Sequence, residues 1–172
     1  GFFRVPRAQW GFASSPIIHE DKVIIQCDVQ KNSFIAALDL KTGKTLWRTA
    51  RTEVPTCSTP TVYVGSEQTQ VIVNGFKHIG GYDLDTGQEL WKLSGGGDIP
   101  VPTPVLGHEL IFITNAHGPG SPIYAIKPKA KGNISLKQGE LANQFIKWSV
   151  PRGGGYMQTP IVYQDHFYTC RD

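Results

Sequence analysis

The sequence of 172 residues has few cysteines, no long apolar run and only a small excess of charge. Cys27, Cys57 and Cys170 are an odd number of cysteines that lie far apart, so a disulfide framework is not expected. No run of about 18 or more apolar residues is present, which predicts no direct insertion of this segment into a membrane. The formal net charge is +3, and the lysines between positions 127 and 137 have no interleaved aromatic residues that would stack on bases. We therefore expect a solvated lysine-rich loop and no nucleic-acid partner.

Signals for targeting are also missing. The chain has no initial methionine, no charged segment followed by an apolar one and no small-residue cleavage site. It begins at residues 1–3 and stops at residues 170–172 within sequence typical of strands, so we expect it to be part of a longer protein. Localisation therefore has to be inferred from other features.

Glycine and proline are abundant, with 19 and 12 residues, and a repeat with a period of 44 residues runs through the chain. The pattern Ala-x-Asp-x-x-Thr-Gly-x-x-x-Trp ends at Trp47 and recurs at Trp91, with glycine in place of alanine. Thr-Pro pairs at positions 59–60 and 103–104 keep the same period. Phe3 lies at the tryptophan position of a preceding unit. A repeat of this length indicates an array of similar structural units.

Each unit contains four short segments typical of strands. In the first unit they are residues 15–18, 22–27, 34–40 and 44–49, separated by turn residues such as Asp, Asn and Gly. Four short antiparallel strands in a repeat of roughly 40 to 50 residues are typical of a β-propeller blade. We therefore predict an all-β fold, a partial propeller with about three full blades and the flanking strands of two more.

The repeat also sets the predicted boundaries of this single domain, residues 1–172. Its expected parts are the last strand of a preceding blade, three blades and the first half of another, at residues 1–7, 14–50, 58–94, 102–150 and 158–172. The third blade departs from the repeat, because Lys127 replaces the aspartate and a polar insertion of about residues 128–144 precedes Trp148. We expect this insertion to form a lobe on the face opposite to the loops that join the blades.

The repeated residues are expected to hold the blades together. The aspartate before Thr-Gly accepts hydrogen bonds from the turn, and the glycine supplies a positive φ. The tryptophan covers the neighbouring blade while its N–H finds a backbone partner. The predicted structural residues are Phe3, Asp39, Gly43, Trp47, Asp83, Gly87, Trp91 and Trp148.

This pattern resembles the tryptophan-docking repeat of the pyrroloquinoline-quinone-like (quinoprotein-like) β-propeller family, over nearly the whole chain. The resemblance implies the propeller fold, but the same blades serve dehydrogenases, scaffold proteins and sensor ectodomains. The chain is similar to outer-membrane-assembly lipoproteins and other envelope propellers. That similarity implies a bacterial, periplasmic or cell-envelope location.

Candidate binding residues lie in the loops that join blades and in those that join the second and third strands of a blade. These loops emerge at one face of an antiparallel propeller, where ligands commonly gather. The predicted ligand-binding face consists of Trp10, Glu53, Asn74, Asp98, Asn115, His117, Arg152 and Tyr156. Two of the loops contain triple glycine, which more often lets the chain cross between blades than it cradles an anion.

No residue pattern predicts catalytic chemistry. The resemblance to quinone enzymes would imply a quinone beside a vicinal disulfide and a calcium ion held by Glu, Asn and Asp, but the chain has no adjacent cysteines. The five histidines are scattered without the spacing of metal ligands, so no metal site is predicted. Cys57, on the loop face, is the one cysteine to test for reactivity.

We therefore predict a non-catalytic binding or scaffolding propeller without a cofactor. Its expected partners are a protein or peptide, bound through the loop face or by strand pairing, and the remaining blades of its parent chain. One alternative is a fragment of a quinone-dependent alcohol or sugar dehydrogenase, with quinone and calcium as cofactors. A second alternative is the sensor ectodomain of a larger signalling protein.

Overall fold

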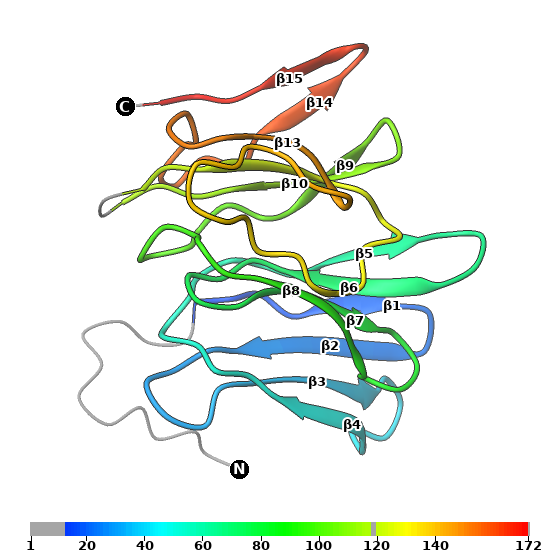
Figure 1. The fold of residues 1–172 in the computed structure, drawn as a ribbon. Coiled ribbons are helices and arrows are strands. Elements are labelled where there is room, and N and C mark those ends of the chain that lie inside the picture. The colour runs from blue at the N-terminus through cyan, green and yellow to red at the C-terminus, as the bar shows by residue number, and fades with distance from the viewer. Residues whose placement is uncertain (1–12, 118–119, 172) are drawn as a thin grey trace.

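The computed structural model describes residues 13–117 and 120–171, and these residues form strands and loops. Two four-stranded antiparallel sheets and one five-stranded sheet, in which a parallel strand is added to four antiparallel ones, lie one above the other and are followed by a two-stranded hairpin (Figure 1). We call the sheets blade 1 (β1–β4), blade 2 (β5–β8) and blade 3 (β9–β11 and β13). The predicted all-β class and its four-stranded units are confirmed. Phe3 and Trp10, which were assigned roles from the sequence, lie outside the described residues.

The strands alternate with short turns because the sequence places turn residues between short apolar segments. Blade 1 contains β1 (Ile17–His19), β2 (Lys22–Cys27), β3 (Phe34–Asp39) and β4 (Thr45–Ala50). Blade 2 contains β5 (Thr61–Val64), β6 (Thr69–Val73), β7 (Ile79–Asp83) and β8 (Glu89–Leu93). Blade 3 contains β9 (Val105–Gly107), β10 (Leu110–Thr114), β11 (Ile123–Ile126) and β13 (Ile146–Val150). The remaining strands are β12 (Gly132–Asn133), β14 (Ile161–Tyr163) and β15 (His166–Tyr168).

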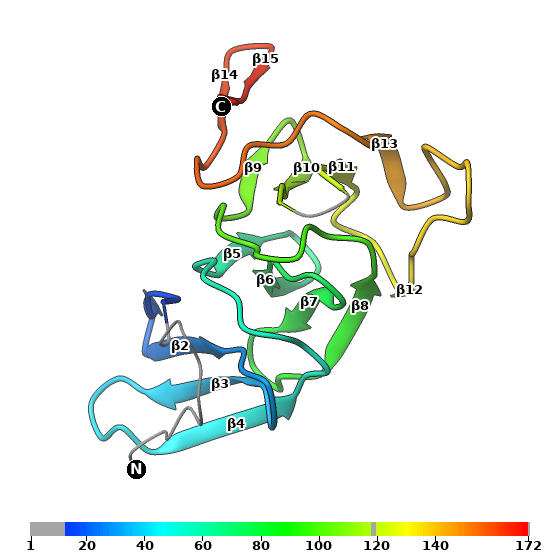
Figure 2. The ribbon, with the colours of Figure 1, turned by 90° about the vertical axis from the view of Figure 1, so that its left-hand side faces the viewer.

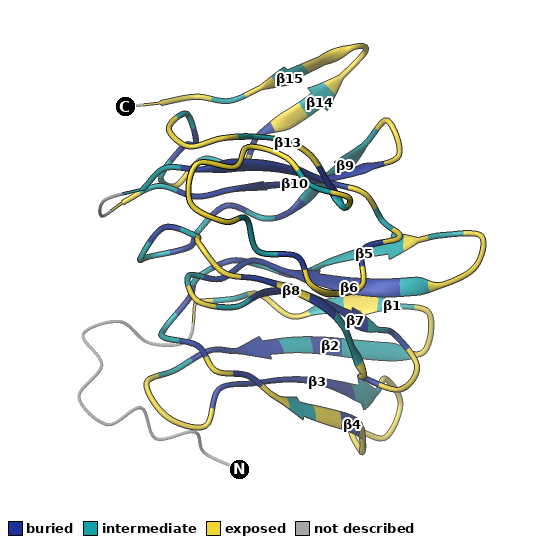
Figure 3. Ribbon diagram, viewed as in Figure 1, coloured by how far each residue is buried: buried dark blue, intermediate teal, exposed yellow. Residues whose placement is uncertain are grey.

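The hydrophobic core lies between the blades rather than within one sheet. Strands alternate their side chains between two faces, so each blade packs one face against each neighbour. The cluster between blades 1 and 2 consists of Ile24, Ile35, Ala37, Trp47, Val71, Val73, Tyr82 and Leu84. A second cluster joins blades 2 and 3 and includes Ile72, Trp91, Leu93, Ile111, Ile113 and Ile126. Figure 3 shows the buried middle strands and the exposed C-terminal hairpin.

The Thr-Gly turns have the hydrogen bonds that the sequence predicts. Asp39 Oδ1 accepts the amide of Thr42 at 2.7 Å and its hydroxyl at 2.6 Å. Asp83 makes the same two bonds to the turn of blade 2. Gly43 and Gly87 have φ values of 69° and 71°, in the left-handed region that favours glycine. The hydrogen bonds from Thr42 also lower the pKa of the Asp39 carboxyl.

The tryptophans contact the blade that follows them in the chain. The Trp47 indole N–H donates to the carbonyl oxygen of Leu84 in blade 2 at 2.8 Å. Trp148 is only half-buried, and its ring lies 6.5 Å from that of Phe167 in β15. These contacts tie the outer strand of one blade to the next blade.

The insertion of blade 3, expected to form a lobe on the opposite face, folds back onto the outer strand of blade 2. Its strand β12 pairs in parallel with the outer strand of blade 2, with Gly132 opposite Trp91 and Asn133 opposite Lys92. Ile134 is 1% exposed and packs into the core between blades 2 and 3. Figure 2 shows the insertion beside β8. Ala130, Ile134 and Leu136 all pack in this core, which explains why the insertion folds back onto the blades.

Across the described residues, no helix is long and apolar enough to cross a membrane.

Candidate functional site

The predicted binding residues lie at one end of the blades, but they separate into two groups. Asp98, His117 and Tyr156 lie together and are partly exposed. Glu53, Asn74 and Asn115 are buried and bond to the protein itself. Arg152 is exposed, and residues 121 and 152 form an isolated bridge.

The exposed group, which we call the loop-face cluster, consists of Asp98, His117 and Tyr156. Each residue comes from a different loop, after β8, β10 and β13 respectively. Asp98 Oδ1 lies 2.5 Å from His117 Nδ1, and the side chains are 39% and 47% exposed. The His117 ring stacks on that of Tyr156 with centroids 5.1 Å apart. The cluster therefore presents a carboxylate, an oriented imidazole and an aromatic ring to solvent.

His117 has an unusual backbone conformation, with φ at 76°. Residues other than glycine rarely adopt positive φ, and such conformations gather at functional positions. The backbone carbonyl of His117 accepts a hydrogen bond from the amide of Asp98 at 3.5 Å. The side-chain and backbone contacts together fix the imidazole relative to the neighbouring loop.

Glu53 is held as a structural anchor between blades 1 and 2. Its carboxylate accepts the amides of Phe76, Lys77 and His78 at 2.8–3.2 Å and that of Val54 at 2.8 Å. The residue is 7% exposed. Because both oxygens accept backbone amides, this carboxylate fixes the loop between β6 and β7 and is not presented to a ligand.

Asn74 and Asn115 belong to a row of side-chain amides that links the blades. Gln26 Nε2 donates to the carbonyl oxygen of Asn74 at 2.9 Å, and Asn74 Nδ2 donates to that of Thr114 at 3.1 Å. Asn115 Nδ2 donates to Asn74 Oδ1 at 2.8 Å. Gln26, Asn74 and Thr114 occupy equivalent positions of successive blades. The residues two positions before them pair with the same repeat position of the next strand, as Ile24 with Ala37, Ile72 with Gly81 and Phe112 with Ala125. The row fastens successive blades together.

A buried ion pair that the sequence did not single out lies beside this row. Arg51 bonds to Asp28 at 2.8 and 3.1 Å, and both side chains are 0% exposed. Arg51 also donates to the Tyr82 hydroxyl at 2.8 Å and to the carbonyl oxygen of His78 at 2.6 Å. Burial is the largest influence on the pKa of Arg51 and lowers it, but the charges of Asp28, Tyr82 and Glu53 and the hydrogen bond to Asp28 together raise that pKa overall. The only signal in the sequence was the place of both residues in loops of the binding face.

The triple glycines allow close crossings of the backbone. A side chain on Gly96 would collide with the carbonyl oxygen of Gly75, and one on Gly154 would collide with that of Asn115. The amide of Gly96 is bonded to the carbonyl oxygen of Phe76 at 3.0 Å. These contacts agree with the crossing role that the sequence favoured over anion binding.

The described residues do not fit the quinone and calcium site that the resemblance would imply. Cys27, Cys57 and Cys170 are free and lie far apart, so they form no vicinal disulfide. Burial raises the pKa of the Cys57 thiol, which reduces the thiolate needed for reactivity. Within residues 13–117 and 120–171, no group of three or more His, Cys, Asp and Glu side chains is placed to hold a metal ion.

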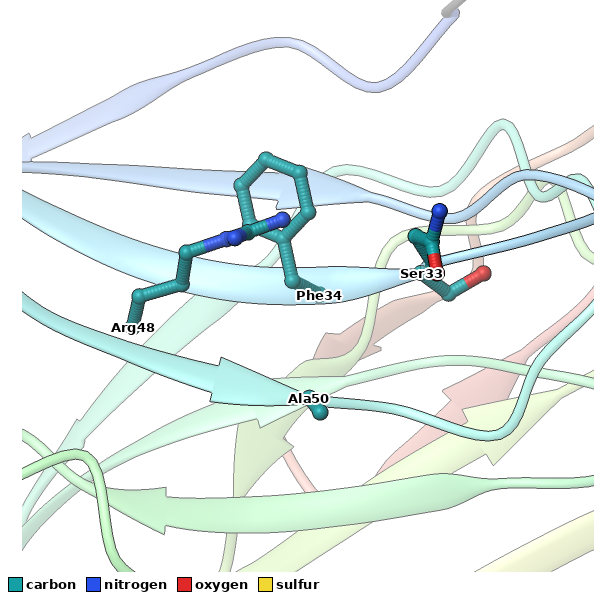
Figure 4. A pocket seen from close by; sticks show the side chains of 5 residues that line it. Ser33, Phe34, Arg48 and Ala50 are labelled. Carbon is teal, nitrogen blue, oxygen red and sulfur yellow. The ribbon is translucent and has the colours of Figure 1, made fainter.

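Among the described residues, two pockets are lined by none of the predicted binding residues. The first, of about 360 Å³, opens beside β3 and β4 and is lined by Asn32, Ser33, Phe34, Arg48 and Ala50 (Figure 4). The Arg48 guanidinium lies over the Phe34 ring, 3.9 Å from its centroid. The second, of about 600 Å³, lies between the β5–β6 hairpin and the insertion, and its lining includes Gln68, Lys129 and Lys131.

The stacked blades are joined through side-chain amides and tryptophans, and blades 1 and 2 contain aspartate-anchored turns. These features define this chain as part of a β-propeller of the quinoprotein-like repeat class. The family model described as outer membrane protein assembly factor BamB matches residues 7–169. The chain therefore belongs to this family. No curated protein matched the chain.

Solved structures share the fold. BamB from Moraxella catarrhalis has a TM-score of 0.53 at 19% identity, over 86% of this chain and 39% of that chain. A europium-containing methanol dehydrogenase has a TM-score of 0.53 at 15% identity, over 73% of this chain and 26% of that chain. The quinohemoprotein alcohol dehydrogenase from Comamonas testosteroni has a TM-score of 0.54 at 16% identity, over 81% of this chain and 21% of that chain. This chain thus spans between about a fifth and two fifths of these proteins, and the likeness extends to the fold.

Proposed function

We propose that this chain forms part of a non-catalytic binding or scaffolding propeller of the bacterial cell envelope, which recognises a protein or peptide at its loop face. The observation that carries the proposal is the loop-face cluster, because Asp98, His117 and Tyr156 converge from three loops and remain partly exposed. Exposed aromatic and charged side chains on loops held by a rigid scaffold are typical of recognition surfaces. The envelope location is supported by the family description, outer membrane protein assembly factor.

The roles of the buried polar residues favour binding over quinone chemistry. Glu53 bonds to backbone amides, and Asn74 and Asn115 bond to neighbouring blades, so these side chains stabilise the scaffold. The chain contains no adjacent cysteines. The dehydrogenases share the fold at 15% and 16% identity, which carries no chemistry over to this chain.

A photo-crosslinking experiment in a longer protein that contains this chain tests the proposal. A photoreactive residue at Met157, which is 62% exposed beside Tyr156, should cross-link a protein partner. The same residue at Leu40, which is 42% exposed in the Thr-Gly turn region, is the control. The Met157 cross-link should be lost in Asp98→Ala and His117→Ala variants.

Two outcomes would contradict the proposal. Equal cross-linking at positions 157 and 40, or cross-linking that survives both substitutions, would show that the loop-face cluster does not recognise the partner. Dye reduction by the purified protein after addition of the quinone and calcium would establish the dehydrogenase instead.

A further inference from the structure

The outer edges of the three blades are covered to different extents. In blade 2, β12 pairs with the outer strand β8 (Figures 1 and 2). In blade 3, the end of the insertion passes beside β13, where Ser149 Oγ donates to the carbonyl oxygen of Leu141 at 2.8 Å. In blade 1, no strand of the described residues pairs with the outer side of β4. Unpaired edge strands are templates for pairing with another chain.

The β8–β12 pairing shows which backbone groups of an outer strand accept an added strand. The amide of Ile134 donates to the carbonyl oxygen of Lys92 at 2.9 Å, and the amide of Ser94 donates to Ser135 Oγ at 2.9 Å. Both blades have the same register, since Trp91 pairs with Gly81 and Trp47 pairs with Ala37. The groups of blade 1 equivalent to those of Lys92 and Ser94 therefore belong to Arg48 and Ala50.

The orientation of these groups in β4 is fixed by the neighbouring hydrogen bonds. The amide of Arg51 donates to the carbonyl oxygen of Ser33 at 2.8 Å, toward the interior of the sheet. Because successive residues of a strand direct their backbone groups to opposite sides, the backbone groups of Ala50 and Arg48 point outward. The register shift between Ala37 and Leu38 does not prevent a further strand from pairing with β4. Blade 2 has the same shift between Gly81 and Tyr82, and its outer strand still pairs with β12.

Charge indicates which kind of segment fits the β4 edge. The turn and strand of blade 1, residues 40–50, contain three cations and no acidic residue. In blade 2 the corresponding residues 84–94 contain two acids and one lysine, and the segment that reaches β12, residues 127–131, contains three lysines. The outer turn and strand of blade 2 and the segment that reaches β12 thus have net charges of opposite sign, although Lys129 itself pairs with Glu67 of the β5–β6 hairpin. The cations of blade 1 are Lys41, Lys44 and Arg48, and the guanidinium of Arg48 is positioned by the Phe34 ring at 3.9 Å.

We propose that the outer edge of β4 binds an extended, acidic segment of a partner protein as an added parallel strand. Main-chain hydrogen bonds to Arg48 and Ala50 supply the affinity, and the cations of residues 40–50 select an acidic segment. The proposal shares with the proposed function only the premise that the propeller binds protein. It uses the rim of blade 1 instead of the loop-face cluster.

The test uses two fluorescent peptides. One has the sequence of residues 129–136, which contains β12, and the other has both lysines of that sequence replaced by glutamate. The glutamate peptide should bind the chain in an anisotropy titration, and the lysine peptide should bind at least about tenfold more weakly. Binding should slow hydrogen exchange of the Ala50 amide.

Two variants make the outcome specific to β4. Arg48→Glu should reverse the preference between the peptides. Ala50→Pro removes an outward N–H without removing a hydrogen bond of blade 1, so it should abolish binding of both peptides while the unfolding midpoint is retained. The loop-face variant Asp98→Ala should bind the glutamate peptide normally, which separates this proposal from the proposed function.

Three results would overturn the proposal. These are equal binding of the two peptides, binding that survives Ala50→Pro, and no binding at all. Self-association that is blocked by Ala50→Pro, in the absence of peptide binding, would identify a second copy of this chain as the occupant and would also overturn the proposal.

Discussion

The indole N–H of Trp91 donates to Gln70 Oε1 at 2.8 Å, within its own blade. The equivalent Trp47 donates directly to the carbonyl oxygen of Leu84 in the next blade. Gln70 Nε2 in turn donates to the carbonyl oxygen of Pro128 at 2.8 Å, at the position one repeat after Leu84. Gln70 is therefore interposed between the tryptophan and the next blade.

The hydrogen bond between Trp91 and Gln70 explains why blade 2 has glycine, at position 81, where the repeat has alanine. A Cβ on Gly81 would collide with Trp91 Nε1 and would lie 2.6 Å from Gln70 Oε1. Ala37, the equivalent residue of blade 1, pairs with Trp47, whose indole reaches the next blade instead. Gly81 thus makes room for the bond between Trp91 and Gln70.

We predict that Gly81→Ala destabilises the chain, although it restores the residue of the repeat and adds a residue better suited to a strand. The collision with the fully buried Trp91 should lower the free energy of unfolding by about 1–3 kcal/mol. Urea unfolding measures this loss. Ala37→Gly is the matched change in blade 1 and should cost about 0.5–1 kcal/mol, the usual effect of glycine in a strand. An unchanged or raised stability of Gly81→Ala would contradict the steric explanation.

The sequence was sufficient for the blades and for the Thr-Gly turns, because these depend on contacts between residues close in the chain. Asp39 and Thr42 are three residues apart and form their bond within one turn. The role of Gln70 was not predicted. Ile17 pairs with Ile24 but Thr61 pairs with Ile72, so the longer β5–β6 hairpin moves Gln70 out of the sequence period.

From the sequence, only the face of the propeller on which the candidate site lies could be predicted. Topology places the relevant loops at one end of the blades, so the residue types there could be named from the sequence. The partner of each side chain depends on contacts between loops, and Asp98 and His117 are brought together from different blades. Glu53 was assigned to ligand binding, whereas its carboxylate accepts the amides of residues 76–78. Periodicity carries no information about such distant contacts.

The two turn glycines provide a matched pair that separates backbone strain from packing. Gly43 and Gly87 have nearly the same φ, but a Cβ on Gly43 meets open space, while one on Gly87 would collide with the ring of Trp47. Gly43→Ala should therefore lower stability by about 1–2 kcal/mol through the left-handed conformation alone. Gly87→Ala should lower stability by about 1–3 kcal/mol more than Gly43→Ala does, because it also displaces Trp47. Equal losses in thermal or urea unfolding would show that Trp47 does not pack on this turn.

The buried ion pair of Arg51 and Asp28 should be strongly coupled. Removing one partner leaves an uncompensated charge in the interior, so Arg51→Met and Asp28→Leu should each lower stability by about 3–5 kcal/mol. The double variant should lose clearly less than the two single losses combined, because neither charge then remains. Additive losses in a double-mutant cycle by urea unfolding would mean that the two side chains act independently.

The stability of the fold should be sensitive to acid because of His78, which lies between Arg51 and Glu89. Burial and the charge of Arg51 lower the pKa of His78 from its ordinary 6.5, and the opposing attraction of Glu89 does not restore it. The Tyr82 hydroxyl lies 3.2 Å from His78 Nε2, and Glu53 is the other acidic group whose charge acts on this imidazole. The folded chain therefore binds fewer protons than the unfolded chain just below pH 6.5.

Stability linked to His78 is consequently present above pH 6.5 and is lost as the pH falls from 6.5 toward the lowered pKa of the folded state. Urea unfolding at a series of pH values should show this decline, and His78→Gln should flatten it. The pKa values of the turn carboxylates Asp39 and Asp83 are lowered from 3.8, so the stability linked to them is lost at lower pH than the 6.5 at which the decline linked to His78 begins. A decline of the same slope in His78→Gln would assign the acid sensitivity to another group.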